Sequence, residues 1–367
     1  MKNCSILWGL IVFTLFPSVQ ARQITTAAST SDSLLMSHIW DFQANAGTAE
    51  GVGLPDTDWV ENALLGTLQL PGCAAALVSA NGLAVTSAAC LRSLDTWIRP
   101  GDTLFVADEL SQEHRLEGLK VRQLSGIKKI ENPGDTFPNV EPDMQSQIHK
   151  GRGHGSYWKY SWRVYDDVRL VFIPPIELEN FGDEDSVYPR YAMDFALFRV
   201  YDKNDQLLDT ESYFAWNDRP PRYRERLYAT VFSKDESFTR VTILDRFDYN
   251  GTVSPSFTTM YGILDLHHSH GAMSSWALPA ELKSLIAGSD LSTALNFSVA
   301  GECAEMGVAI IDIDMEILGI SFDNAHTQEG LRCVGMSTAG ILSLLRSPLN
   351  AKNIVEELAE QSRWQNR

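Results

Sequence analysis

The sequence predicts an all-β fold of the barrel or sandwich type. Short apolar and β-branched runs recur along the chain, and residues that favour turns separate them. Helical periodicity is scarce, because only residues 278–287 and the amphipathic segment 351–364 carry it. This combination is typical of barrels and sandwiches rather than of folds in which strands alternate with helices.

The first two predicted strands form a hairpin. An apolar run over residues 74–79 stops at Asn81-Gly82, and a second run covers residues 83–86. Asn-Gly between two such runs is a strong signal for a tight turn. We therefore expect the two runs to pair as antiparallel strands.

Further strands follow at intervals towards the C-terminus. The run 164–173 ends at Pro174-Pro175, and the run 195–201 alternates between two faces. Two more runs, 307–313 and 317–322, are expected to pair across Asp314-Met315-Glu316. The remaining predicted strands are 228–232 and 239–244.

The first 21 residues are predicted to be a secretory signal peptide. Lys2 precedes an apolar run from Ile6 to Phe16, and the small residues Val19 and Ala21 precede the expected cleavage site. The run is shorter than the roughly 20 apolar residues that a membrane anchor needs, so we favour cleavage over an uncleaved anchor. The protein is then expected to be periplasmic or secreted, with no membrane insertion after cleavage.

The charge of the chain argues against nucleic-acid binding. The formal net charge is −17, and such a field repels nucleic acid and anionic lipid. Lys150, Arg152 and Lys159 form a basic cluster that is interleaved with the aromatic residues of 157–160. We favour a solvated, aromatic-rich loop here over a nucleic-acid site.

Four cysteines lie beyond the predicted signal peptide: Cys73, Cys90, Cys303 and Cys333. An even number in an exported chain indicates disulfides, and four cysteines allow three pairings. Pairing by proximity in sequence gives Cys73–Cys90 and Cys303–Cys333. Each bridge would stabilise the fold by roughly 3 kcal/mol in the chain-entropy model.

No metal or cofactor is expected. The cysteines have no Cys-x-x-Cys spacing, which argues against zinc or redox chemistry. His267, His268 and His270 are a possible ligand cluster, but adjacent residues of a strand point to opposite faces, so only His268 and His270 would share one. We favour a polar loop over a metal site at these histidines.

Five collinear segments carry a resemblance to a known family. They are residues 71–90, 165–183, 189–195, 295–298 and 317–323. The first ends in Thr-Ser-Ala-Ala-Cys where the family has Thr-Asn-His-His-Cys, and the third reads Pro-Arg-Tyr-Ala-Met-Asp-Phe where the family has Pro-Arg-His-Thr-Gly-Asp-Phe. Together they resemble the bacterial dipeptidyl-peptidase 7/11 type of serine peptidase.

The resemblance implies a trypsin-like double antiparallel β-barrel with a C-terminal helix, each barrel having six strands. The expected domains are a mobile leader (22–47), a first barrel (48–204), a second barrel (205–350) and a C-terminal helix and tail (351–367). Family members carry a large helical domain in the second barrel. Residues 245–275 are too few to form it and are expected to be its remnant, so the helical insertion is lost.

The resemblance also places the catalytic residues. Acyl transfer by serine needs a hydroxyl nucleophile, a histidine that takes its proton and a carboxylate that orients the histidine. Ala89 stands at the histidine position and Met306 at the serine position, whereas Asp194 keeps the carboxylate. With no histidine to orient, Asp194 is expected to be a structural carboxylate that accepts hydrogen bonds from nearby backbone N–H groups.

The substrate pocket is expected to differ from that of the family as well. Asp323 matches the carboxylate that helps bind the free amine of the substrate, and Asn324 stands where side-chain preference is tuned. The pair Asp185-Ser186 replaces the Asn-Trp pair that shares the amine-binding task. We expect an inactive exported homologue that binds a peptide or protein through the former cleft or acts as a scaffold. The alternative is an active serine-type dipeptidyl-peptidase that releases N-terminal dipeptides.

Overall fold

The computed structural model describes residues 39–41, 57–94, 104–131, 143–150, 157–179, 193–219, 225–232, 239–244, 296–300, 306–327, 330–346 and 349–364. The expected signal peptide, residues 245–275, the helix over 278–287, the histidine cluster and Asp185-Ser186 lie outside these residues. None of the helices in the described part of the chain is long and apolar enough to cross a membrane.

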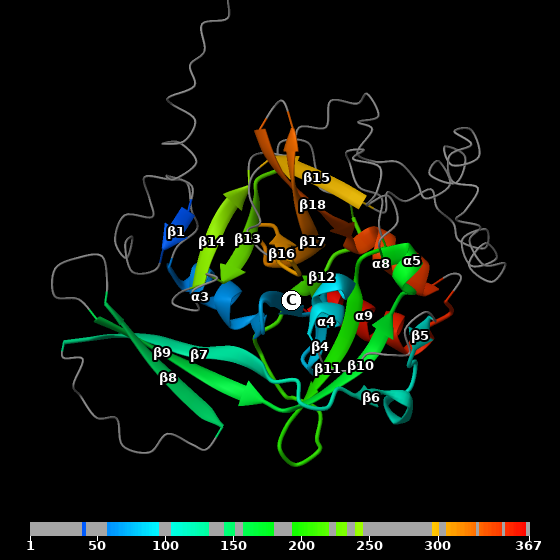
Figure 1. Cartoon of the computed structure of the whole chain (residues 1–367), viewed down its shortest axis with the longest axis horizontal. Helices are drawn as coiled ribbons and strands as arrows, with labels where there is room; N and C mark the ends of the chain where they lie inside the picture. The colour runs from blue at the N-terminus through cyan, green and yellow to red at the C-terminus, as the bar shows by residue number, and fades with distance from the viewer. Residues whose placement is uncertain are drawn as a thin grey trace, which may run out of the picture.

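Two sheets make up the fold, one above the other in Figure 1. The lower sheet has ten strands in the order β5-β10-β11-β4-β3-β2-β7-β9-β8, with β6 paired to β10. Its strands are β2 (Thr67–Leu70), β3 (Cys73–Leu77), β4 (Leu83–Thr86), β5 (Phe105–Val106), β6 (His114–Arg115), β7 (Val121–Ile130), β8 (Met144–Lys150), β9 (Tyr157–Tyr165), β10 (Asp167–Ile173) and β11 (Ala196–Tyr201). All of these pairings are antiparallel.

The upper sheet has eight strands in the order β1-β14-β13-β16-β17-β18-β15. The remaining strand, β12, pairs with β17 in parallel, whereas the other pairings are antiparallel. The strands are β1 (Ile39–Asp41), β12 (Ala215–Trp216), β13 (Leu227–Phe232), β14 (Thr239–Leu244), β15 (Asn296–Ala300), β16 (Ala309–Ile311), β17 (Glu316–Thr327) and β18 (Gly330–Ser337). Strand β1 lies within the segment that was expected to be a leader.

Helices are short and lie beside the sheets. Among the described residues they are α3 (Thr57–Leu65), α4 (Ala88–Ser93), α5 (Ile176–Glu179), α8 (Thr338–Arg346) and α9 (Lys352–Trp364), together with the 3-10 turn η2 (Leu110–Gln112). The mostly β architecture confirms the predicted fold class. The sheets contain eight and ten described strands, more than the six predicted for each barrel.

One apolar core joins the two sheets. The same cluster of buried side chains contains Ala74 and Leu83 of the lower sheet and Ile310 and Leu318 of the upper sheet. A buried hydroxyl pair adds a polar link, because Thr67 Oγ1 donates to Thr230 Oγ1 at 2.9 Å. The two sheets therefore share one buried core.

Most of the predicted strands are found. The hairpin at Asn81-Gly82 forms between β3 and β4, and Gly82 has a φ of +77°, which a side chain would disfavour. Strands β13 and β14 match the predicted runs, and β16 pairs with β17 as expected. The predicted C-terminal helix is α9. Strand β11 alternates as predicted, but both of its faces are buried in apolar clusters.

Two sequence-based predictions are wrong. The run 164–173 is not one strand, because β9 ends at Tyr165 and β10 begins at Asp167. The loop predicted around the basic and aromatic residues is largely strand. Trp158 and Tyr160 are 8% and 1% exposed and belong to the core, while Lys159 points away from it. Aromatic residues and lysine alternate here because successive side chains of a strand point to opposite faces, of which only one is buried.

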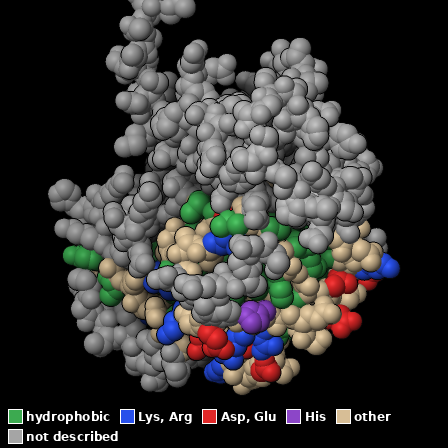
Figure 2. Space-filling view, turned by 45° about the vertical axis from the view of Figure 1, so that its right-hand side comes forward, with side chains coloured by type: hydrophobic (Ala, Val, Ile, Leu, Met, Phe, Trp, Pro, Cys, Tyr) green, Lys and Arg blue, Asp and Glu red, His purple; other side chains and the backbone are tan. Residues whose placement is uncertain are grey.

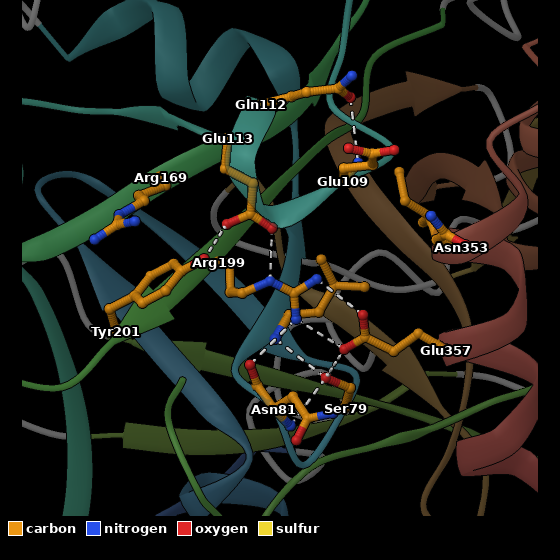
Figure 3. A network of polar contacts seen from close by, with 12 residues as sticks. Ser79, Asn81, Glu109, Gln112, Glu113, Arg169, Arg199, Tyr201, Asn353 and Glu357 are labelled. Carbon is orange, nitrogen blue, oxygen red and sulfur yellow. Dashed lines mark hydrogen bonds and ion pairs between the residues drawn. The ribbon is translucent and has the colours of Figure 1, made fainter. Parts of the chain in front are cut away.

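A buried ion-pair network docks the C-terminal helix onto the lower sheet (Figure 3). Arg199 of β11 donates through Nη1 and Nη2 to the two carboxylate oxygens of Glu357 in α9, both at 2.8 Å. Its Nε donates to Glu113 at 2.7 Å, and Tyr201 donates to the other oxygen of Glu113. Burial opposes the charge of Arg199, but the two carboxylates more than offset this and raise the pKa of its guanidinium.

On the face shown in Figure 2, acidic and basic side chains are mixed along the lower part, so neither sign of charge dominates there.

The start of α9 is held from the lower sheet as well, because Asp108 Oδ1 accepts from the backbone N–H of Asn353 at 2.9 Å. The C-terminal helix is therefore joined to the lower sheet both at its first turn and at its middle.

The predicted disulfide between Cys73 and Cys90 is confirmed, with the two Cα atoms 6.1 Å apart. It ties the start of β3 to helix α4. Cys333 of β18 is disulfide-bonded as well. Its predicted partner, Cys303, lies outside the described residues, so that pairing stays a prediction.

Candidate functional site

Ala89, which stands at the predicted histidine position, lies in the first turn of α4. Ser87 precedes this helix, and its Oγ accepts a hydrogen bond from the backbone N–H of Cys90 at 3.3 Å. Serine is a preferred N-cap residue for this reason, and it fixes where the helix begins. Ala89 is partly exposed in the first turn, directly before the disulfide-bonded Cys90.

Asp194 lies beside this helix start. It precedes β11 and is fully buried. Its Oδ1 oxygen accepts from the Ser87 hydroxyl at 2.8 Å and from the backbone N–H of Ala89 at 2.9 Å. A buried carboxylate needs such partners to offset its loss of water. The geometry is that of a carboxylate that supports the start of α4.

Met306, which stands at the predicted serine position, lies on a tight loop that packs against the core. The carbonyl of Met306 accepts from the backbone N–H of Ala74 at 3.1 Å, and the N–H of Gly307 donates to the carbonyl of Ser321 at 2.9 Å. Gly307 has a φ of +76°, and a Cβ atom there would lie 2.1 Å from the carbonyl oxygen of Ala74. Only glycine fits at this position.

The three predicted triad positions are brought into one region. Ala89 and Asp194 are in direct contact. Met306 binds the backbone of Ala74, which follows Cys73, and its side chain packs against the apolar cluster that contains Cys73 and Cys90. The disulfide therefore connects the loop of Met306 to the helix of Ala89.

Asp312 holds the turn between β16 and β17. Asp312 follows β16, and its Oδ1 accepts from the backbone N–H groups of Asp314 and Glu316 at 2.9 and 3.0 Å. Its Oδ2 accepts from Arg219, which also binds Glu225. Burial raises the pKa of Asp312 to about 6, and the nearby Glu316 charge adds to this, whereas the backbone donors and Arg219 oppose it.

The other predicted site residues are only partly placed. Asp323 and Asn324 lie in β17, where their backbones pair with Val334 and Cys333. The amine-binding pair Asp185-Ser186 lies outside the described residues. Sequence reasoning missed Ser87 and Ser321, which hold Asp194 and the loop of Met306. A serine directly before a short helix is a recognisable N-cap signal and could have identified Ser87.

No group of three histidine, cysteine, aspartate or glutamate side chains is arranged to hold a metal ion within the part of the chain that the structure describes.

Part of the chain matches a known protein family. Residues 139–228, which include β8 to β11 and Asp194, match the profile of the family described as Peptidase S46. Over this segment the chain is similar to the peptidase S46 family.

Two relatives illustrate how S46 peptidases compare with this chain. It is 38% identical over 74 residues to the Asp/Glu-specific dipeptidyl-peptidase of Porphyromonas gingivalis, which covers 19% of this chain and 10% of that protein. It is 27% identical over 164 residues to dipeptidyl-peptidase 7 of the same organism, which covers 35% of this chain and 23% of that protein. The matches thus span less than a quarter of these relatives.

Similarity in fold to a solved structure extends over much more of the chain. The crystal structure of DPP11 from Porphyromonas endodontalis in complex with the dipeptide Arg-Glu superposes with a TM-score of 0.65 at 10% identity. The superposition covers 81% of this chain and 94% of that chain. A second crystal structure of DPP11 from the same organism gives a TM-score of 0.63 over 80% of this chain.

Proposed function

We propose that this protein is an exported, catalytically inactive homologue of the S46 peptidases that binds a peptide or protein partner at the former catalytic cleft or serves as a scaffold. One observation carries the proposal. At the predicted catalytic centre, the carboxylate of Asp194 accepts hydrogen bonds from Ser87 and from the backbone of Ala89, and Ala89, at the histidine position, has no imidazole.

The residue types support this proposal. Ala89 has no group that takes a proton, and the thioether of Met306 is not an acyl-transfer nucleophile. Loss of the serine or the histidine alone costs about 10⁶ in turnover in the subtilisin series. The nearby Ser87 and Ser321 are fully buried, so neither hydroxyl is open to a substrate.

The first prediction tests inactivity directly. We expect the purified protein to show no turnover of dipeptidyl fluorogenic substrates and no covalent labelling by a fluorophosphonate probe, because labelling needs an activated hydroxyl. Intact-mass spectrometry after incubation with the probe measures this. Dipeptidyl-peptidase 7 of P. gingivalis is the positive control. Stoichiometric labelling of any serine would favour the alternative, an active serine-type dipeptidyl-peptidase.

A second prediction asks how far the cleft has changed. We expect the double variant Ala89→His with Met306→Ser to remain at least a hundredfold below a typical kcat of roughly 10 s⁻¹. A histidine at position 89 would lie next to Asp194, since the two residues are in contact. Acyl transfer also needs oxyanion donors and a positioned substrate amine, and Ala304 and Asp185-Ser186 alter the residues expected to supply them.

Steady-state kinetics with dipeptidyl substrates and intact-mass detection of an acyl-enzyme measure this outcome, with Ala89→His alone as the control. Turnover of the double variant within a hundredfold of 10 s⁻¹ would show that the cleft is intact. The protein would then be a recently silenced peptidase rather than a remodelled binding protein.

A further inference from the structure

A groove of about 560 Å³ lies at the far end of the lower sheet from the candidate site. It runs between the start of β8, the end of β9 and Lys120 on one side and the loop 202–209 that follows β11 on the other. Its lining residues are Lys120, Asp143, Gln145, Arg163, Val164, Tyr165, Asp166, Tyr201, Asp202, Lys203, Leu207, Leu208 and Asp209.

The groove is separate from the predicted catalytic centre. Asp194 precedes the first residue of β11, whereas Tyr201 is its last. At about 3.3 Å per residue of extended chain, Asp194 and Tyr201 lie roughly 23 Å apart. A ligand in the groove would therefore not touch Ala89, Asp194 or Met306.

Both walls of the groove are held by internal hydrogen bonds. In the loop, Asp202 Oδ1 accepts from the backbone N–H groups of Asn204 and Gln206 at 2.8 and 2.9 Å. On the opposite wall, the N–H of Val164 donates to the carbonyl of Asp143 at 2.8 Å. A groove with fixed walls binds its ligand with less loss of conformational entropy.

The floor of the groove is aromatic and apolar. Tyr165, Tyr201 and Leu208 are buried there. The two hydroxyl groups already donate within the protein, Tyr165 to Gln123 at 2.9 Å and Tyr201 to Glu113 at 2.7 Å. The guanidinium of Arg169 covers one face of the Tyr201 ring at 3.8 Å, so the floor offers the remaining ring surface and methyl groups to a ligand rather than further donors.

The rim of the groove carries both signs of charge. Lys120, Arg163 and Lys203 stand among Asp143, Asp166 and Asp209, and all but Asp143 are exposed. The Oδ1 oxygen of Asp143 has no hydrogen-bond partner among the described residues. The aspartates would repel a polyanion and the basic residues would repel a polycation, so neither kind of ligand suits this rim.

We propose that this groove is a second binding site, which takes a short extended peptide segment with both acidic and basic side chains. Such a segment can place its carboxylates against Lys120 and Lys203 and its amines against Asp166 and Asp209. Its apolar portions would cover the tyrosine floor. The volume is in the range of about 300–1,000 Å³ that is common for ligand sites.

The probe is a fluorescein-labelled Glu-Lys-Tyr-Glu-Lys peptide, compared with versions in which the charged residues are all Glu or all Lys. Fluorescence anisotropy measures binding to the full chain. We expect the mixed peptide to bind at least tenfold more tightly than either single-sign peptide. Lys120→Glu with Lys203→Glu should weaken mixed-peptide binding at least tenfold and shift the preference towards the all-Lys version. Lys128→Glu, on an exposed position of β7 outside the groove, should change it less than twofold.

Circular dichroism establishes that the variants are folded. If the mixed peptide fails to bind at 1 mM concentration (about −4 kcal/mol), or binds the double variant and the wild type equally, the groove is not a peptide site. The groove variants leave the predicted catalytic centre unchanged. Their outcome and that of the labelling experiment are therefore independent.

Discussion

Gly307→Ala is expected to lower the free energy of unfolding by about 2–5 kcal/mol, from left-handed backbone strain of about 1–2 kcal/mol and overpacking of about 1–3 kcal/mol. Gly307 has a φ of +76°, and an added Cβ would lie 2.1 Å from the carbonyl oxygen of Ala74 and 2.3 Å from Thr86 Oγ1. Neither atom can move freely, because Thr86 Oγ1 donates to that same carbonyl at 2.6 Å. The contact between the two sheets must shift instead.

Gly72→Ala is the matched control. Gly72 has a φ of +88°, but nothing lies within 4 Å of a Cβ added there. It should cost only the conformational part, about 1–2 kcal/mol. Urea unfolding of the oxidised proteins, followed by tryptophan fluorescence, measures both variants. Equal losses for the two would mean that the close approach at Gly307 relaxes at little cost.

Arg199→Met is expected to destabilise the protein by about 3–5 kcal/mol, because it leaves buried carboxylates without their partner. The side chains of Arg199 and Glu113 are 4% and 2% exposed, and that of Glu357 is 17% exposed. The methionine keeps most of the apolar volume, so the loss reports the charge. Urea unfolding of the variant measures the change.

Arg115→Met is the control for Arg199→Met, because the Arg115 side chain is 49% exposed and its ion pairs are longer, at 3.6 and 4.0 Å. Exposed pairs contribute less than about 1 kcal/mol. Combining Arg199→Met with Glu113→Gln and Glu357→Gln should recover part of the stability. A loss at Arg199 no larger than at Arg115 would contradict the view that this network holds the C-terminal helix.

Local signals predicted the fold class and most individual strands. Asn81-Gly82 fixed a hairpin, and the period of the C-terminal segment identified α9, because turn residues and periodicity act over a few positions. The break at Asp166 could not be predicted, since the apolar pattern continues across it. Arg199 was also missed as a central residue, because its partner is distant in sequence.

The candidate site was predicted in part. Cysteine positions and motif order placed Ala89, Asp194 and Met306 in one region, and the structure joins them through the Cys73–Cys90 bridge. The hydrogen bond from the Ser87 hydroxyl to Asp194 could not be predicted, because the sequence motif does not show where that hydroxyl points. The groove beside β11 depends on three segments meeting in space, which sequence periodicity does not report.

The link between Arg199 and Glu357 has a consequence for the order of folding during synthesis. The two residues are 158 positions apart, so the ribosome completes β11 long before it makes the acid that neutralises it. Until then, the half-made sheet would have to bury a guanidinium that lacks one of its two carboxylates. We therefore expect the lower sheet to finish packing only after Glu357 has been synthesised. Such dependence on distant contacts is typical of slowly folding β proteins.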